Sequence, residues 1–288
     1  MAKRIDNSLT PSLLAMVPLA AEPIFHVGNF PVTNSMINAW IATGFFVLVA
    51  IVAARRKTLV PRGVHNVIEM VIETLLAQAE KVTSSREKAK AFFPLVATIF
   101  LFVLVSNWMG QLPGTGSFGI YELVHGEVEL VPLLRPATSD LNMTLAIAVL
   151  SVCMSHVVGI RSLGFVNHVS KFVNIRGIFK AFKKGPMAVA VACIEFGVGL
   201  LEIVSEFAKA LSLSLRLFGN IFAGEILIGV MLGLVSFIVP VPFMFLELLV
   251  GVIQATVFAM LVLVYLSVAT QGHGDHEEHD AHHEPAHA

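Results

Sequence analysis

Long apolar runs alternate with polar segments along the chain, and four of the runs have the length of membrane segments. Three are single runs at about residues 36–54, 92–112 and 141–160, and the fourth is a block at about residues 187–269. A helix needs about 20 apolar residues to cross a hydrocarbon core about 30 Å thick. Pro240 and Pro242 interrupt the last block, so the pattern predicts five membrane helices, the last two forming a hairpin.

Residues 64–81 show a different pattern, with apolar positions spaced for one face of a helix. That face consists of Val64, Val67, Ile68, Val71, Leu75 and Leu76. Glutamates occupy other positions, so we predict an amphipathic helix that lies along the membrane surface. The predicted fold class is therefore all-α integral membrane, with about five membrane helices and one surface helix.

The fourth block predicts an unusually long helix before the proline turn. An unbroken helix over residues 187–239 would be about 80 Å long, far more than the thickness of the membrane core. It must either be steeply tilted or break near Gly219 or Gly224. We favour the tilt, because its polar residues share an arc of roughly 120° at about 100° per residue. These residues are Glu195, Glu202, Ser205, Glu206, Lys209, Ser212, Arg216 and Asn220.

Arg216 is the residue that most requires a functional explanation. An arginine at the centre of a membrane helix costs about 2.5–3.5 kcal/mol on insertion scales, and its guanidinium stays protonated. A helix-end arginine that snorkels to the headgroups is the alternative, but Arg216 is far from both ends of the run. A stripe that touches water at the interface could explain Glu195–Lys209, but not Arg216 or the embedded Glu225 on the opposite face.

The final helix, at about residues 243–269, has a sparser polar stripe. Glu247 and Gln254 are seven residues apart and therefore lie on nearly the same face. A membrane glutamate can be a neutral packing residue that is hydrogen-bonded. Together with Arg216 across a proline turn, Glu247 and Gln254 favour an ion pathway.

Composition and charge support a membrane protein. Hydrophobic residues make up 56% of the 288 positions and charged residues 14%, unlike a soluble domain. No basic segment interleaved with aromatics suggests nucleic acid, and we expect no cofactor or metal site. Cys153 and Cys193 lie in apolar runs, where we expect small buried side chains.

Loop charges predict the orientation. Residues 55–90 carry eight lysines and arginines and residues 161–184 carry six, whereas residues 113–140 carry only Arg135 among four acids. The positive-inside rule then places the N-terminus outside and the C-terminus in the cytoplasm. These loops follow bacterial rules without a transit peptide, so we expect a bacterial cytoplasmic membrane.

We predict three regions, namely an outer segment at 1–35, a membrane domain at 36–269, and a tail at 270–288. Lys3 and Arg4 before an apolar stretch imitate a signal peptide, but Pro18 interrupts that stretch and we expect an irregular segment instead. The tail mixes histidines with acids. It could bind metal weakly, but we expect it to be disordered and solvated.

The residues around Arg216 resemble subunit a of the F-type rotary ATP synthases. Arg216 is followed by the same Leu-Phe-Gly-Asn run as the essential arginine of that family. Gln254 in Val-Ile-Gln-Ala-Thr-Val-Phe, the stretch Asp140-Leu-Asn142-Met-Thr144 and the pair Asn34-Ser35 also match the family. The resemblance covers about residues 21–269 and leaves out the tail.

The resemblance implies a proton-translocating stator that lies against a rotating ring of small, carboxylate-bearing subunits. Arg216 would attract the deprotonated ring carboxylate and separate two aqueous half-channels. The outer half-channel would contain Asn220, Glu225, Glu247 and Gln254. Less specifically, the exit toward the cytoplasm would contain Glu202 and Ser205, with Ser212 beside the arginine. Members of the family often pair a histidine with a carboxylate where this chain has Glu225 and Glu247.

The implied partners are the ring, peripheral-stalk subunits and a soluble ATPase head. The chain has no P-loop, so phosphate chemistry would take place on another subunit. A secondary transporter is one alternative, although we find no internal repeat of the kind transporters show. A receptor or structural subunit is another, but it would not need Arg216 and Glu225 inside one apolar helix. Whether the ion is H⁺ or Na⁺ stays open.

Overall fold

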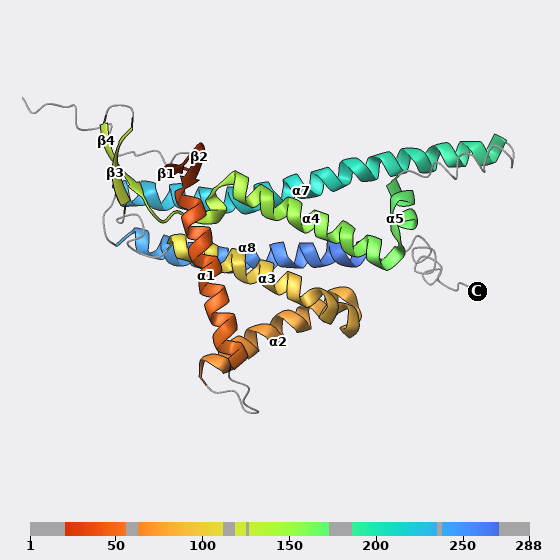
Figure 1. Ribbon diagram of the computed structural model, residues 1–288, viewed down its shortest axis with the longest axis horizontal. Helices are drawn as coiled ribbons and strands as arrows, with labels where there is room; N and C mark the ends of the chain where they lie inside the picture. Colours follow the sequence, from red (N-terminus) through yellow and green to blue (C-terminus); the bar gives the residue numbers. More distant parts are fainter. Residues whose placement is uncertain are drawn as a thin grey trace, which may run out of the picture. The chain divides into compact units, whose positions relative to one another are not determined.

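The computed structural model describes residues 21–55, 63–111, 119–124, 127–172, 186–234 and 238–270. Figure 1 shows these residues as coloured helices and strands. Most of the expected outer segment and nearly all of the expected tail lie outside the described residues, so the predictions about them stay predictions.

Five helices in the described ranges are long and apolar enough to cross a membrane. They are α1 (Asn34–Arg55), α3 (Arg86–Gln111), α4 (Leu141–Leu163), α7 (Pro186–Leu234) and α8 (Pro240–Ala269). Each coincides with one predicted segment, and α8 begins at the first of the two prolines. The predicted all-α membrane architecture is confirmed.

The amphipathic helix is also present, as α2 (Val64–Thr83). Leu75 and Ala79 are buried, whereas Glu69 and Glu73 are exposed. Burial therefore follows the predicted apolar face. Its position along the membrane surface stays a prediction.

α7 is one continuous helix of 49 residues (Figure 1). It runs through Gly219 and Gly224 without interruption, so the alternative of a break at either glycine is wrong. At about 1.5 Å per residue, 49 residues span about 70 Å, more than twice the apolar thickness of a bilayer. This length supports the predicted steep tilt.

Shorter elements between the helices were not predicted. Two antiparallel hairpins pair β1 (Pro23–Val27) with β2 (Phe30–Thr33) and β3 (Gly119–Val124) with β4 (Glu127–Pro132). A short 3-10 helix, η3 (Ala137–Ser139), follows β4, and α5 (Phe165–Phe172) follows α4. Such elements have few residues; β1 and β2 lie in the predicted outer segment, and the others lie in segments predicted only as charged loops.

The helices contribute to two compact units. The first takes its residues from Met1–Thr74, Ala97–Ala146 and Ser214–Ala259, and the second from Leu75–Val96, Ile147–Leu213 and Met260–Ala288. Within the first unit, Val103, Leu217, Ile221 and Phe258 are among the buried core residues. Within the second, Val262, Leu263 and Leu266 are buried.

Candidate functional site

Arg216 lies in the first unit, on an exposed face of α7. Its neighbour Leu217 is buried, so the helix presents Leu217 to the core and Arg216 outward. No hydrogen bond or ion pair connects Arg216 to another residue in the part of the chain that the structure describes. Gly219 and Ala223 are also exposed, and a Cβ added at Gly219 would meet no atom within 4 Å. The guanidinium can therefore bind a group outside the described residues, and the small exposed residues Gly219 and Ala223 leave space for that group to approach.

Asn220 and Gln254 come together in the first unit, as their shared assignment to one pathway requires. The Asn220 side-chain amide donates a hydrogen bond from Nδ2 to Oε1 of Gln254, at 2.7 Å. Gln254 is buried on α8, while Asn220 is exposed one turn after Arg216 on α7. This bond joins the two long helices next to the arginine.

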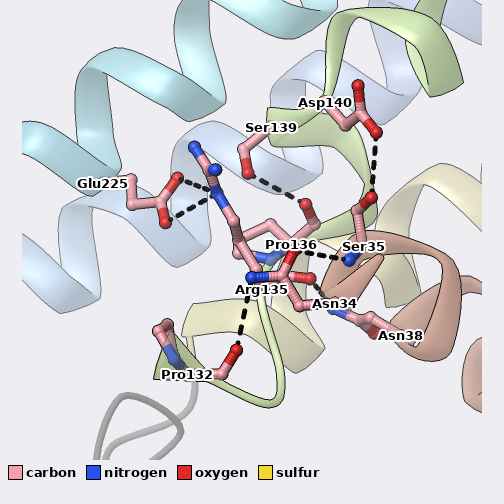
Figure 2. A network of polar contacts seen from close by, with 9 residues as sticks. All are labelled: Asn34, Ser35, Asn38, Pro132, Arg135, Pro136, Ser139, Asp140 and Glu225. Carbon is pink, nitrogen blue, oxygen red and sulfur yellow. Dashed lines mark hydrogen bonds and ion pairs between the residues drawn. The ribbon is translucent and has the colours of Figure 1, made fainter. Parts of the chain in front are cut away.

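Glu225 is held by an arginine that the sequence analysis did not assign to the site. Nε of Arg135 lies 3.2 Å from each carboxylate oxygen of Glu225, and Figure 2 shows the two contacts side by side. The Arg135 side chain is 2% exposed and that of Glu225 is 20% exposed. Cζ of Arg135 also lies 6.0 Å from the centre of the Phe222 ring. The one available signal was that Arg135 is the only cation in an acidic segment.

Hydrogen bonds from α1 position the loop that carries Arg135 (Figure 2). Nδ2 of Asn38 donates to the carbonyl oxygen of Arg135 at 2.6 Å, and Nδ2 of Asn34 donates to the carbonyl oxygen of Pro132 at 3.2 Å. Both asparagines are buried. They satisfy backbone carbonyls that a buried loop would otherwise leave without partners. The backbone that carries the arginine is thus held by α1 at two points, the carbonyl groups of Pro132 and Arg135.

Asp140 anchors the other end of this loop. Oγ of Ser35 donates to Oδ2 of Asp140 at 2.9 Å, and Oδ1 accepts the backbone N–H of Asn142 at 2.9 Å. An aspartate that accepts a backbone N–H at the start of a helix is a stabilising N-cap. Asn34, Ser35 and Asp140, which matched the family pattern, therefore have a structural role here: they hold the Arg135 loop against α1 and α4.

Glu247 lies against Gly224, the residue before Glu225, and has a different environment from that of Glu225. Its side chain is buried on α8, and a Cβ added at Gly224 would overlap its carboxyl group. The missing side chain at Gly224 therefore leaves room for the carboxyl group of Glu247. Oε1 of Glu247 is buried and makes no hydrogen bond to the described residues. Arg135 contacts Glu225, and no ion pair of Glu247 occurs among the described residues.

The three residues expected on the exit side do not form one group. Glu202 lines a cavity of about 40 Å³ in the second unit, together with His156, Glu206 and Lys209. Ser205 and Ser212 are exposed and do not line it. The buried hydroxyl nearest in sequence to Arg216 is that of Ser214, which lies 3.2 Å from Oγ1 of Thr144 within the first unit.

Two further expectations concern cysteines and metals. Cys153 and Cys193 are both exposed, so the prediction that they are buried is wrong. They lie on outward faces of apolar helices, where an apolar side chain fits lipid as well as a core. Among the described residues, no group of three or more His, Cys, Asp or Glu side chains is arranged to hold a metal ion.

The fold and the site define a class of protein. Among five apolar helices, α7 carries an outward-facing arginine and a glutamate that pairs with the buried Arg135 of a loop, and α8 carries a second, buried glutamate. Ionisable groups at such positions are expensive in a membrane and mark ion pathways. The chain is therefore a multi-pass membrane protein of the ion-translocating class.

Comparison with known proteins identifies the family. The family described as ATP synthase A chain matches residues 36–267. An ATP synthase subunit a from Gloeobacter violaceus is 33% identical over 265 residues, covering 92% of this chain and 95% of the relative. One from Moorella thermoacetica is 30% identical over 250 residues, covering 87% and 96%. The chain belongs to the family of ATP synthase subunit a, a proton-translocating component of the membrane sector that works in a complex with other ATP synthase subunits.

Proposed function

We propose that Arg216 faces the membrane carboxylate of a rotating ring and separates two proton half-channels. The observation that carries this proposal is an outward-facing guanidinium without an ionic partner in the described residues, flanked by exposed small residues. Small residues allow another helix to approach closely within a membrane. Because the arginine stays charged, it attracts a deprotonated carboxylate and opposes direct passage of protons. Loss of coupled ATP synthesis in Arg216→Ala, with assembly retained, is the result this proposal requires.

The outer half-channel consists of Asn220, Gln254, Glu225 and Glu247. The hydrogen bond between Asn220 and Gln254 and the packing of Glu247 on Gly224 support a single polar pathway between α7 and α8. The two glutamates have different roles. A carboxylate in a close ion pair must break that pair before it carries a proton, whereas Glu247 has no such restraint. Glu247 is thus the proton-exchanging group, and Glu225 is the group that Arg135 holds in place.

On the exit side, Glu202 is supported by its place at a cavity that is also lined by His156, Glu206 and Lys209. Ser205 and Ser212 rest on the family resemblance alone. The ring, the peripheral stalk and the soluble ATPase head are the proposed partners. Copurification with a soluble ATPase separates this function from that of a secondary transporter, which would be active without one.

Replacing Glu247 with glutamine is expected to lower ATP-driven proton pumping by about tenfold or more, since an amide cannot relay a proton. Pumping is measured in inverted membrane vesicles at matched levels of assembled complex. Glu225→Gln should slow pumping less. Glu73→Gln, an exposed glutamate on α2, is the matched control and should have no effect. Unchanged flux in the Glu225→Gln, Glu247→Gln double variant would show that both glutamates are structural.

The proposed orientation predicts labelling from opposite sides of the membrane. Lys88 is exposed at the start of α3, and Ile120 is exposed in the hairpin that follows α3. With Cys153 and Cys193 replaced by serine, a membrane-impermeant maleimide should label Lys88→Cys only from the cytoplasmic side and Ile120→Cys only from the outside. A permeant maleimide should label both. Labelling of both from one side would contradict the five-segment topology.

A further inference from the structure

A second polar cluster lies within the second unit, on α4, α5 and α7. Nδ1 of His156 lies 3.2 Å from Nε2 of His168, a hydrogen-bonding distance between two imidazole rings. On its other side, Nε2 of His156 lies 3.7 Å from Oε2 of Glu206. Oε1 of Glu206 in turn accepts a hydrogen bond from Nζ of Lys209 at 2.6 Å. Two hydrogen-bonded pairs, His168 with His156 and Glu206 with Lys209, therefore lie next to each other at ion-pair distance.

The two histidines are brought together by the turn between α4 and α5. Gly164 has a φ of +83°, which favours glycine, and it lets α5 fold back beside α4. His168 is then buried against Gly159, where an added Cβ would lie 2.7 Å from Cε1 of the ring. The ring of Phe172 makes edge contacts with both histidines, at 5.6 Å between ring centres. The close approach of the imidazoles thus depends on the absence of a side chain at position 159.

This cluster opens onto the cavity beside Glu202. Besides both histidines, the lining includes Glu206, Lys209 and Tyr265. A volume of about 40 Å³ suits a few water molecules, because one water needs about 10–15 Å³ in the same measure. Phe172, Val268 and Ala269 make part of the lining apolar, and the ionisable side chains and Ser155 offer such waters hydrogen-bond partners. Protons can therefore pass between Glu202 and the histidine pair through water.

We propose that His156 and His168 form a proton relay on the exit side of the translocation pathway, next to Glu202. This inference rests on the proposed function of the chain. Imidazole takes up and releases protons near neutral pH, and each ring has one nitrogen to receive a proton and another to release it. When one ring takes up a proton on its outer nitrogen, the proton between His156 Nδ1 and His168 Nε2 moves to the other ring. That second ring then releases a proton from its own outer nitrogen. Glu206, held by Lys209, orients His156 and balances the charge of an imidazolium.

The groups that face the relay come from every neighbouring helix. α7 contributes Glu202, Glu206 and Lys209, and α8 contributes Tyr265, whose ring centre lies 5.4 Å from Nζ of Lys209. His156 is 31% exposed and His168 is 5% exposed. The partly exposed ring can exchange protons with groups outside the chain, and the buried ring cannot do so directly. This asymmetry gives the relay an outer and an inner member.

The test uses His156→Ala in the complete ATP synthase complex. We expect proton pumping to fall by about tenfold or more with assembly unchanged, because a proton donor and acceptor is lost. Added imidazole should restore pumping through the space left by the side chain, whereas pyrazole, which has the same size but is a much weaker base, should not. His26→Ala, an exposed histidine on β1, is the control and should pump normally.

Two outcomes overturn the relay. Full pumping in the His156→Ala, His168→Ala double variant would show that protons take another route. Equal rescue by imidazole and pyrazole would show that the ring only fills space. The proposed function is judged separately: if Arg216→Ala abolishes coupling while the histidine variants pump normally, only the relay fails. Gly159→Ala adds a check that keeps both imidazoles, since it displaces His168 and should also slow pumping.

Discussion

Replacing Arg216 with alanine is expected to abolish both ATP-driven proton pumping and proton-driven ATP synthesis, while the subunit still inserts and assembles. Assembly should survive because the Arg216 side chain is exposed and contacts no ionic partner among the described residues. Coupling should be lost because a neutral residue cannot draw a ring carboxylate into its charged form or oppose protons between half-channels. Both activities are measured in membrane vesicles, with the amount of complex determined in parallel.

Lysine should restore little at this position. A compact ammonium can lose its proton when desolvated, and it lacks the planar fork that binds a carboxylate through two hydrogen bonds. Leu215→Ala is the matched control, since Leu215 is the exposed neighbour on the same helix, and it should retain coupling. Substantial coupled synthesis in Arg216→Ala at normal assembly would mean that the chain is not the rotary stator proposed here.

The second large effect is expected at Arg135, where substitution by methionine should strongly reduce the amount of assembled subunit. Methionine leaves the carboxylate of Glu225 largely buried without its cation, and removing one partner of a buried ion pair costs about 3–5 kcal/mol. The partial exposure of Glu225 places the expected cost near the lower end of that range. The amount of subunit in intact complexes, and its resistance to protease, measure the effect.

A double variant separates the ion pair from the arginine itself. Glu225→Gln in the Arg135→Met background removes the unpaired charge and should recover much of the lost assembly, as a double-mutant cycle would reveal. The control is Arg86→Met. Arg86 is 69% exposed and pairs with Glu80, and loss of such a surface pair costs less than about 1 kcal/mol. If Arg135→Met and Arg86→Met assembled equally well, the Arg135–Glu225 pair would have no structural importance.

Much of the fold follows from local patterns. Apolar runs of about 20 residues define membrane helices whatever their neighbours are. Pro240 marks where the long apolar block divides, and α8 begins at this residue. The two hairpins were not predicted, because strands of four to six residues have little periodicity to detect, and α5 is amphipathic but only eight residues long. The uninterrupted α7 was favoured over a broken helix because its polar residues stayed in phase, and phase is a property of a single helix.

The sequence by itself also identified Arg216, since a charged residue inside an apolar run can be recognised without knowing which group it contacts. Only the tertiary structure decided which groups meet. Arg135 and Glu225 are 90 residues apart, and their contact depends on a loop held by α1. Asn220 with Gln254, and His156 with His168, likewise depend on the packing of separate helices. Helical periodicity places a residue on a face of its own helix, but the crossing angle and register of two helices decide what that face touches.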